Sequence, residues 1–294
     1  MTNCGFCAVL GVPNAGKSTL VNALVGSKVS IVTHKVQTTR SRIRAIAMDG
    51  QTQIIFVDTP GIFAPKRKLD EAMVSAAWGA AGEADERVLL ADARAGLDAE
   101  TAEIIAGLKR AGLSAMLALN KIDLVAHERL LGLAQTFNAA FAFSETFMIS
   151  ALKGHGVDAL KGKIAARMPA GPWLYPADQS ADMQLRFLAA EITREKLYLR
   201  LHQELPYSST VETESWEERP DGSVRIQQVI YVERDGQKKI LLGSKGETIR
   251  DIGAAARKEL EVELDRRVHL FLFVKVRENW AKDPERLRMM GLEP

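Results

Sequence analysis

The sequence predicts an α/β domain with a doubly wound, mostly parallel sheet, followed by a smaller α+β domain. Two observations carry this prediction. Up to about residue 168, short apolar runs alternate with periodic segments, a pattern typical of parallel strands covered by helices on both faces. After a proline-rich stretch, the order changes to a helix, two β-rich runs, a short apolar run, a second helix and a last strand.

Size and composition allow two folded domains and exclude a strongly basic nucleic-acid-binding tail. The chain has 294 residues, of which 47% are hydrophobic, and its 39 basic and 37 acidic residues give a net charge of +2. No apolar run reaches the roughly 18 residues of a membrane-spanning helix. With two cysteines and no secretory leader, we expect a reducing, cytoplasmic environment.

Five strands are expected in the first domain. Each is short and apolar and precedes a loop and a periodic segment; in order they are FCAVLGV, IIFVDTP, ERVLLADA, SAMLALNK and TFMIS. Cys4 and Cys7 have the C-x-x-C spacing of a redox site. The strand continues past Cys7 into a loop, however, whereas a redox pair begins a helix. We therefore expect both cysteines to be buried in the first strand.

Residues 169–181 are predicted to link a first domain, residues 1–168, to a second, residues 182–294. Three of the ten prolines fall in residues 168–181, and such a density cannot continue a helix or a central strand. In the second domain we expect a hairpin turn at RPDG, a short strand at KKILL and a helix after the loop GSKG. This order predicts a small antiparallel sheet with helices on one side.

A phosphate-binding loop follows the first strand. The stretch GVPNAGKST matches G-x-x-x-x-G-K-[ST] and precedes the helical pattern TLVNALVG. Backbone N–H groups at a helix N-terminus hold phosphates, Lys17 would reach the β- and γ-phosphates, and Ser18 would bind Mg²⁺. The nucleotide-binding residues predicted here are Gly11, Val12, Pro13, Asn14, Ala15, Gly16, Lys17, Ser18 and Thr19.

Three further motifs follow predicted strands, at the edge where doubly wound sheets bind ligands. VDTPG places Asp58 near the Mg²⁺ shell and the N–H of Gly61 near a γ-phosphate. In NKID, the carboxylate of Asp123 can accept both the ring N–H and the amine of guanine, which adenine does not present in that arrangement. SALKG can supply a backbone N–H to the base carbonyl. The predicted residues are Asp58, Thr59, Pro60, Gly61, Ile62, Asn120, Lys121, Ile122, Asp123, Ser150, Ala151 and Leu152.

With these four motifs in order, residues 6–168 resemble the translation-factor-related GTPases. In that family a switch segment carries a Thr that binds Mg²⁺ and directly precedes an Arg. KVQTTRSR fits this pattern with Thr39, and Thr38 is the alternative, so the expected Mg²⁺ ligands are Ser18, Thr39 and Asp58. The same stretch also predicts a basic surface loop that contains Lys35, Arg40, Arg42 and Arg44.

The resemblance also implies how hydrolysis proceeds. Where Ras-like proteins have a glutamine that orients water, this chain has Ile62, and an aliphatic side chain cannot orient the attacking water. In related GTPases the residue at the position of Asn14 helps to hold a K⁺ ion where an arginine finger would act. The alternative is that Asn14 only stabilises a turn, and both interpretations stay open. The predicted catalytic residues are Asn14, Lys17 and Thr39.

The loop GSKG is a second candidate phosphate site. It lacks the Lys-Ser/Thr pair of a nucleotide loop and matches the G-x-x-G of a KH module, which clamps the backbone of single-stranded RNA. The alternative is an ordinary strand–helix turn. The predicted RNA contacts are Gly243, Ser244, Lys245, Gly246, Lys238, Lys239 and Arg250, and the predicted apolar groove for the bases consists of Ile240, Leu241, Leu242, Ile249 and Ile252.

A GTPase domain followed by a KH domain resembles the Era family of bacterial ribosome-assembly GTPases over nearly the whole chain. The stretches that carry the resemblance include GVPNAGKSTLVNAL, QTTRSRI, ELPYSSTVE, ERDGQKKILLGSKG and HLFLFVKVRENWA. It implies a P-loop GTPase domain and a KH type II domain that use GTP, GDP and Mg²⁺, bind small-subunit (16S) ribosomal RNA near its 3′ end and act in 30S subunit biogenesis. It also implies a cytoplasmic monomer with peripheral contact to the inner membrane.

Two other functions are compatible with the sequence. A GTPase that drives tRNA modification would have a related first domain, but we would expect a cysteine or a cofactor site in the partner region, and residues 182–294 contain no cysteine. Alternatively, the second domain docks a protein or a membrane and does not bind RNA. Salt-dependent binding to single-stranded RNA separates this last alternative from the KH prediction.

Overall fold

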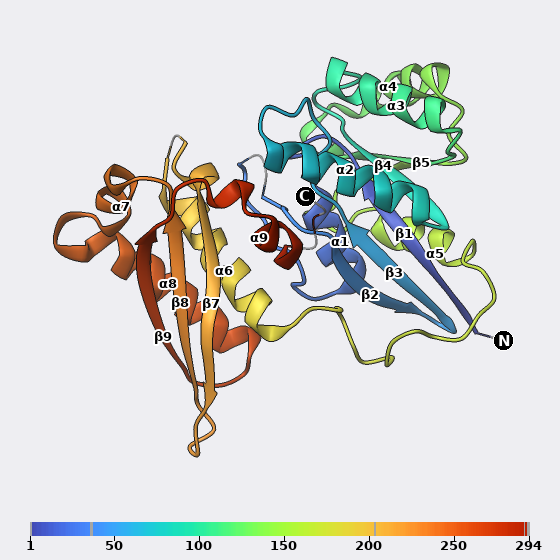
Figure 1. Ribbon diagram of the computed structural model, residues 1–294. Coiled ribbons are helices and arrows are strands. Elements are labelled where there is room, and N and C mark those ends of the chain that lie inside the picture. The colour runs from blue at the N-terminus through green and yellow to red at the C-terminus, as the bar shows by residue number, and fades with distance from the viewer. Residues whose placement is uncertain (1, 36–37, 203, 291, 293–294) are drawn as a thin grey trace. The chain divides into compact units, whose positions relative to one another are not determined.

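The computed structural model describes residues 2–35, 38–202, 204–290 and 292. The chain divides into two compact units: the first comprises Met1–Asp182 together with Arg288–Pro294, and the second spans Met183–Leu287 (Figure 1). The predicted linker, residues 169–181, is part of the first unit in this division. Among the described residues, no helix has the length and apolarity needed to cross a bilayer.

The first unit contains a six-stranded sheet in the order β2-β3-β1-β4-β5-β6. All neighbouring pairs are parallel except β2 and β3. The strands are β1 (Asn3–Leu10), β2 (Ile43–Asp49), β3 (Thr52–Asp58), β4 (Glu86–Asp92), β5 (Met116–Asn120) and β6 (Thr146–Met148). The mostly parallel sheet is confirmed, and so are the five expected strands. The edge strand β2 was not predicted, because a charged Arg44 interrupts its apolar pattern directly after the basic switch segment.

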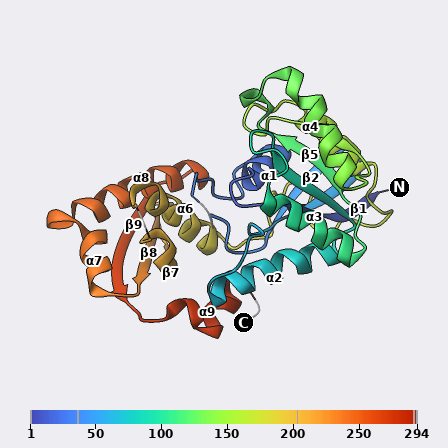
Figure 2. The same cartoon turned by 90° about the horizontal axis from the view of Figure 1, so that it is seen from above.

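In the described part of the first unit, five α-helices flank this sheet. They are α1 (Lys17–Val25), α2 (Lys68–Glu83), α3 (Ala99–Ala111), α4 (His127–Ala140) and α5 (Val157–Ala165). Helices α1 and α5 contact each other and β3, whereas α2 contacts β1, and Figure 2 shows α1 and α2 on opposite sides of the sheet. The sheet therefore has helices on both faces, as the alternating pattern predicts.

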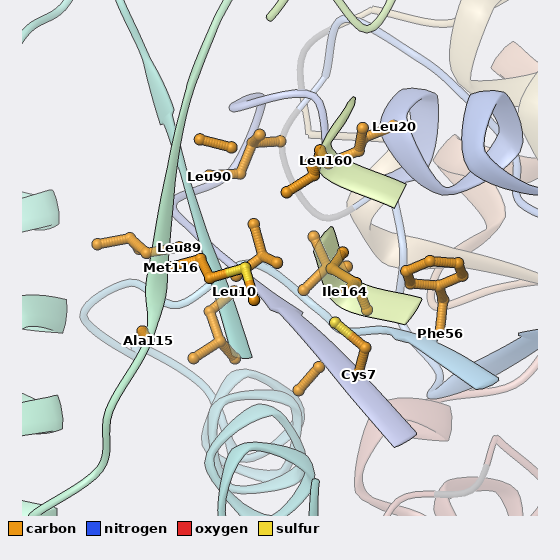
Figure 3. Packing of buried hydrophobic residues seen from close by; sticks show 14 of the residues in the cluster. Cys7, Leu10, Leu20, Phe56, Leu89, Leu90, Ala115, Met116, Leu160 and Ile164 are labelled. Carbon is orange, nitrogen blue, oxygen red and sulfur yellow. The ribbon is translucent and has the colours of Figure 1, made fainter. Parts of the chain in front are cut away.

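The two cysteines are structural. Cys4 and Cys7 are free thiols buried in β1, and Cys7 packs among Leu10, Phe56 and Ile164 (Figure 3). Burial raises the pKa of the Cys7 thiol far above its usual value. A thiol that resists ionisation is a poor nucleophile, which confirms the prediction of a buried strand and excludes a redox site at Cys7.

The proline-rich segment runs along the first unit's sheet. Asn3 forms an antiparallel bridge with Ala170, and Ala45 of β2 forms another with Ala181. The backbone N–H of Asp182 donates to the carbonyl of Arg44 over 2.9 Å. The segment is therefore fastened to β2, the strand that follows the switch segment.

The second unit has a three-stranded sheet in the order β7-β8-β9. The strands and main helices are α6 (Leu185–Arg200), β7 (Ser209–Glu218), β8 (Val224–Val232), α7 (Asp235–Leu242), α8 (Glu247–Glu263), β9 (Val268–Val276) and α9 (Pro284–Met289). The hairpin at RPDG is confirmed, since β7 and β8 are antiparallel around it. The prediction of an antiparallel sheet is wrong for β9, which pairs parallel to β8 because α7 and α8 form a crossover between the two strands.

The prediction of a strand at KKILL is wrong, because these residues belong to helix α7. The Gln237 side chain accepts hydrogen bonds from the backbone N–H groups of Glu233 and Arg234 and so caps the helix at its start. A five-residue apolar run does not by itself distinguish strand from helix. The GSKG loop consequently joins two helices.

Candidate nucleotide and RNA sites

The loop between β1 and α1 needs glycine at two positions. Gly11 and Gly16 have φ angles of 154° and 101°. A Cβ atom at Gly11 would lie 2.5 Å from the carbonyl oxygen of Leu90, and one at Gly16 would lie 2.4 Å from Nδ2 of Asn120. Only glycine lets this loop bend closely against the ends of β4 and β5.

Lys17 places its ammonium group inside this loop. Its Nζ donates to the carbonyl oxygens of Gly11 (3.1 Å) and Val12 (3.0 Å). Burial lowers the pKa of Lys17 to about 8, and the nearby Asp58 carboxylate only partly opposes that shift. A desolvated ammonium whose partners are neutral carbonyls is well suited to binding a phosphate anion.

Three side chains with oxygen atoms that can bind a metal ion lie close together beside the same loop. The Ser18 hydroxyl donates to Oδ2 of Asp58 over 2.8 Å, and the Thr39 hydroxyl reaches the same atom over 3.4 Å. Burial raises the pKa of Asp58, while Lys17 and the two hydroxyl groups oppose that rise. The other carboxylate oxygen, Oδ1, is buried without a hydrogen-bond partner among the described residues.

This donor set fits Mg²⁺. The ion prefers hard oxygen ligands and is commonly bound through one carboxylate together with phosphate oxygens. Thr38 has a different environment, because its hydroxyl bonds the carbonyl of Lys35 (2.7 Å) and the hydroxyl of Thr33 (2.6 Å). The structure thus brings Thr39, and not Thr38, to Ser18 and Asp58.

The segment after β3 closes over the phosphate loop. The N–H of Ile62 donates to the carbonyl of Gly11 over 3.1 Å, and a Cβ atom at Gly61 would lie 2.8 Å from Pro13. The side chain of Ile62 is buried in the hydrophobic core. It is therefore unavailable to a water molecule near the phosphates.

One part of the switch prediction is wrong. Arg40 is only 2% exposed, so the basic segment is not a surface loop throughout. Arg42 is also engaged: its Nε donates to the carbonyl of Ala76 in α2 over 2.8 Å. Arg40 is thus buried and Arg42 is bonded to α2, and a count of basic residues cannot distinguish such side chains from solvent-exposed ones.

Asn120 connects the motifs that follow β1, β5 and β6. Its Nδ2 donates to the carbonyl of Ala15 over 2.9 Å, and its Oδ1 accepts the N–H of Ala151 over 2.9 Å. Both hydrogen bonds are buried. The side chain of Asn120 thus sets the separation between the phosphate loop and the SALKG loop.

The residue expected to select guanine remains accessible. Asp123 lies in a short 3-10 helix (Ile122–Leu124) and is exposed. A hydrogen bond from the Ser150 hydroxyl lowers the pKa of Asp123 and keeps it ionised. Ser150 is itself buried, whereas Leu152 is 77% exposed. The carboxylate is therefore held by a hydrogen bond from a buried residue and is still exposed to solvent, so that it is accessible to a base.

Asp92, at the end of β4, belongs to this site although no motif identified it. Its Oδ2 accepts a hydrogen bond from Lys121 over 2.7 Å, and the same ammonium donates to the carbonyl of Asn14 over 2.7 Å. The one available signal was its position, since an acid at the carboxyl end of a parallel strand lies on the ligand-binding edge.

The GSKG loop has the backbone of a specialised turn. Gly243, Lys245 and Gly246 all have positive φ angles, of 70°, 49° and 77°. A Cβ atom at Gly243 would lie 2.3 Å from Oγ1 of Thr248, at the start of α8. Lys245 and Ser244 are exposed, and Nη2 of Arg250 donates to the carbonyl of Lys245 over 3.4 Å. The loop therefore presents backbone and one lysine to solvent.

The expected apolar groove is smaller than predicted. Leu241 and Ile252 are buried in the core of the second unit, so they cannot contact a base. Leu242 and Ile249 are half-buried, and Ile240 is 62% exposed. The helical periodicity of α7 explains the difference, because it turns neighbouring apolar residues toward opposite sides.

Two family profiles match the two units. The profile described as "50S ribosome-binding GTPase" matches residues 6–121, and a KH domain profile matches residues 204–281. The first match includes the loop of Lys17 and the carboxylate of Asp58. The second includes GSKG with both of its flanking helices.

Curated relatives extend the similarity over the whole chain. GTPase Era of Afipia carboxidovorans is 63% identical over 292 residues, which cover 99% of this chain and 95% of that relative. GTPase Era of Mesorhizobium japonicum is also 63% identical over 292 residues, covering 99% of this chain and 94% of the relative. Both comparisons therefore extend over both units.

Solved structures agree with these relatives. A crystal structure of Era in complex with MgGDPNP and nucleotides 1506–1542 of 16S ribosomal RNA superimposes with a TM-score of 0.94 at 37% identity, covering 99% of each chain. A crystal structure of a single-residue variant of Aquifex aeolicus Era bound to GDP and AlF4⁻ gives a TM-score of 0.93 at 37% identity, again over 99% of each chain. On fold, motifs and full-length identity together, the chain belongs to the Era family of GTPases.

Proposed function

We propose that this chain binds and hydrolyses GTP with Mg²⁺ and grips 16S ribosomal RNA near its 3′ end during 30S subunit biogenesis. The observation that carries the nucleotide part is the convergence of Ser18, Thr39 and Asp58 beside the buried ammonium of Lys17. The RNA part rests on the GSKG loop and on the relative of 37% identity that holds 16S RNA and MgGDPNP.

Each residue of the nucleotide site has a defined role in this proposal. Mg²⁺ bound by Ser18, Thr39 and Asp58 would neutralise charge on the phosphate oxygens. Lys17 would exchange its two carbonyl partners for phosphate oxygens, and the loop N–H groups would hold the remaining charge. Asp123 would select guanine, and Asn120 would fix the base-binding segment relative to the phosphate loop.

Hydrolysis on this chain relies on positioning and electrostatics. With Ile62 buried, no side chain directly after Gly61 orients the attacking water. Asn14 has a φ angle of 62°, which supports its role in the turn, and its side chain is exposed beside the phosphate loop, where a K⁺ ion would act. The test compares GTP turnover in K⁺ and in Na⁺. If the wild-type chain requires K⁺ and Asn14→Ala loses that requirement, then Asn14 is the residue that holds the ion.

The switch is coupled to the second unit through the chain that connects them. Thr39 lies four residues before β2, and β2 pairs with residues 180–182 of the proline-rich segment. A change in the switch when Mg²⁺ and GTP bind would therefore reach the connection to the KH domain through hydrogen-bonded backbone. We also propose a cytoplasmic monomer with peripheral contact to the inner membrane, which the family resemblance alone supports.

The experiment for the RNA function reverses one charge at the clamp. The probe is an RNA of nucleotides 1506–1542 of 16S ribosomal RNA, and its affinity for the full chain is measured by fluorescence anisotropy. Lys245→Asp is expected to weaken binding by about tenfold or more, because it replaces a phosphate-facing cation with an anion. Lys258→Asp is the matched control, since it makes the same charge change on an exposed position of α8.

Equal losses in both variants would mean that only net charge matters and would contradict a clamp at GSKG. Unchanged affinity in Lys245→Asp, with the chain folded and GTPase activity intact, would favour the second candidate, a protein- or membrane-docking module. That candidate has its own support in the second unit, where Phe271 and Phe273 are 43% and 47% exposed.

A further inference from the structure

The carboxylate of Asp92 has an unusually complete set of partners for a residue outside the known motifs. Its Oδ2 accepts from Nζ of Lys121 (2.7 Å) and Nη2 of Arg94 (2.8 Å), and its Oδ1 accepts from the backbone N–H of Arg94 (2.9 Å). The side chain is only 13% exposed. In the sheet, Asp92 pairs with Asn120, so it lies directly beside the start of NKID.

The Lys121 ammonium, which is paired with Asp92, connects two turns of strained backbone. Lys121 and Asn14 are non-glycine residues with φ angles of 63° and 62°, a conformation that L-amino acids adopt rarely. The Nζ atom of Lys121 donates to the carbonyl of Asn14 over 2.7 Å. One ammonium group therefore bridges the apex of the phosphate loop and the segment that carries Asp123.

We propose that Asp92 is a positioning residue for guanine nucleotides, which holds the Lys121 ammonium on the Asn14 carbonyl. It thereby sets the distance between the phosphate loop and the base-selecting segment. Asp92 itself touches neither base nor phosphate in this role. The inference rests on the proposed function of NKID and adds the residue that holds this motif at a fixed position relative to the phosphate loop.

Charge explains why a carboxylate is needed at this position. Lys121 and Arg94 both approach Asp92, so that a neutral residue would leave two cations side by side with no anion between them. Although burial raises it, hydrogen bonds from Arg94 and Lys121 hold the pKa of Asp92 at about 2. The carboxylate is thus ionised at any pH at which the protein works.

The test uses the full chain and a fluorescent (mant) GDP. In Asp92→Asn, the amide keeps the size of the side chain but loses its charge, and nucleotide dissociation is expected to be about tenfold faster. The loss is expected mainly in nucleotide affinity, seen as a raised KM for GTP with a smaller change in kcat, because Lys17 and the Mg²⁺ ligands are not altered. Arg94→Ala is the matched control, since it removes the other partner of Asp92 and leaves the Lys121 bridge.

A double-mutant cycle separates this role from a general loss of structure. If Asp92 acts through Lys121, then the Asp92→Asn/Lys121→Gln double variant releases mant-GDP no faster than Lys121→Gln alone. Additive effects would overturn the proposal, as would unchanged dissociation in Asp92→Asn or a fall in kcat with unchanged KM. Asp92→Glu, which restores the charge, is expected to recover part of the affinity.

One further variant distinguishes failure of this inference from failure of the proposed site. Asp123→Asn is expected to abolish selection of GDP over ADP if NKID binds the base. If Asp123→Asn loses that selection while Asp92→Asn behaves as wild type, the base site at NKID is supported and the positioning role of Asp92 is refuted. If Asp123→Asn still prefers GDP, the proposed site itself is wrong.

Discussion

The hydroxyl oxygens of Ser18 and Thr39 lie 2.8 Å apart, and both contact the same carboxylate oxygen of Asp58. These residues come from helix α1, the switch segment and the end of β3, which are separate in the sequence. A cation that replaced their mutual hydrogen bonds would join all three elements at once. Occupancy of this one point by a cation would therefore tie the switch segment to α1 and β3.

Removing the Thr39 hydroxyl is expected to loosen the Mg²⁺ site. In Thr39→Ala we expect the Mg²⁺ concentration for half-maximal GTPase activity to rise about tenfold, because one oxygen ligand and a switch contact are lost. Titration of Mg²⁺ at saturating GTP measures this. Thr38→Ala is the control, and a larger effect there than in Thr39→Ala would reverse the assignment.

The buried ammonium of Lys17 predicts a specific pH dependence of nucleotide binding. Its pKa is lowered to about 8 in the free protein, and bound phosphates would raise it again. Affinity is therefore fully present below about pH 8 and falls above it, by up to about tenfold per pH unit, because binding must then take up a proton.

Calorimetric titration of GDP from about pH 6.5 to about pH 9 measures this dependence, and buffers of different ionisation enthalpy report the proton uptake directly. The upper limit keeps the guanine ring largely in its neutral form. An affinity that stays constant over this range would show that Lys17 does not change its protonation on binding.

The first glycine of GSKG is expected to be indispensable for RNA binding. Gly243 combines a φ of 70° with a ψ of −178°, a region essentially restricted to glycine, and a Cβ there would clash with Thr248. In Gly243→Ala we expect RNA affinity to fall by about tenfold, since the loop must shift. Gly236→Ala in α7 is the control, because a Cβ there meets no atom within 4 Å. Equal RNA affinities for the two variants would contradict the clamp.

Gln53 is expected to hold the connecting segment on the sheet. Its fully buried side chain accepts the N–H groups of Leu174 (2.9 Å) and Tyr175 (3.0 Å) and donates to the carbonyl of Tyr175 (2.8 Å). Gln53→Ala should lower the free energy of unfolding by about 3 kcal/mol, because it leaves these groups unpaired beside a cavity.

Chemical denaturation measures that loss, and limited proteolysis near residues 174–175 reports release of the segment. Gln51→Ala, at an exposed turn between β2 and β3, is the control and should change neither. If Gln53→Ala resisted proteolysis as wild type does, the segment would be held by its other contacts.

The nucleotide motifs could be placed from sequence because each follows an apolar strand. Asp58 and Asn120 are the last residues of β3 and β5, and Lys17 begins the helix that follows β1. The alternating pattern predicts that the carboxyl ends of these parallel strands meet at one edge. What the pattern could not predict was pairing among the side chains. The bridge from Asp92 through Lys121 to Asn14 depends on two positive φ angles that residue type alone does not indicate.

The second unit was predicted less well, for a related reason. KKILL is too short to show a helical period, and its helix depends on a cap by Gln237. Because of this error, the GSKG loop was predicted between a strand and a helix, whereas it joins two helices. For the same reason β9 was predicted to be antiparallel, whereas it is parallel to β8. The GSKG residues were still identified, because their function depends on local backbone and charge more than on the element before them.

The most direct test of the central claim is the affinity of the full chain for nucleotides 1506–1542 of 16S ribosomal RNA, measured with Mg²⁺ and either GDPNP or GDP. We predict binding about tenfold tighter with GDPNP, and no difference between the two nucleotides in Thr39→Ala, because the switch is then uncoupled from the ion. Equal RNA affinity with both nucleotides in the wild-type chain would contradict control of the RNA clamp by the GTPase site.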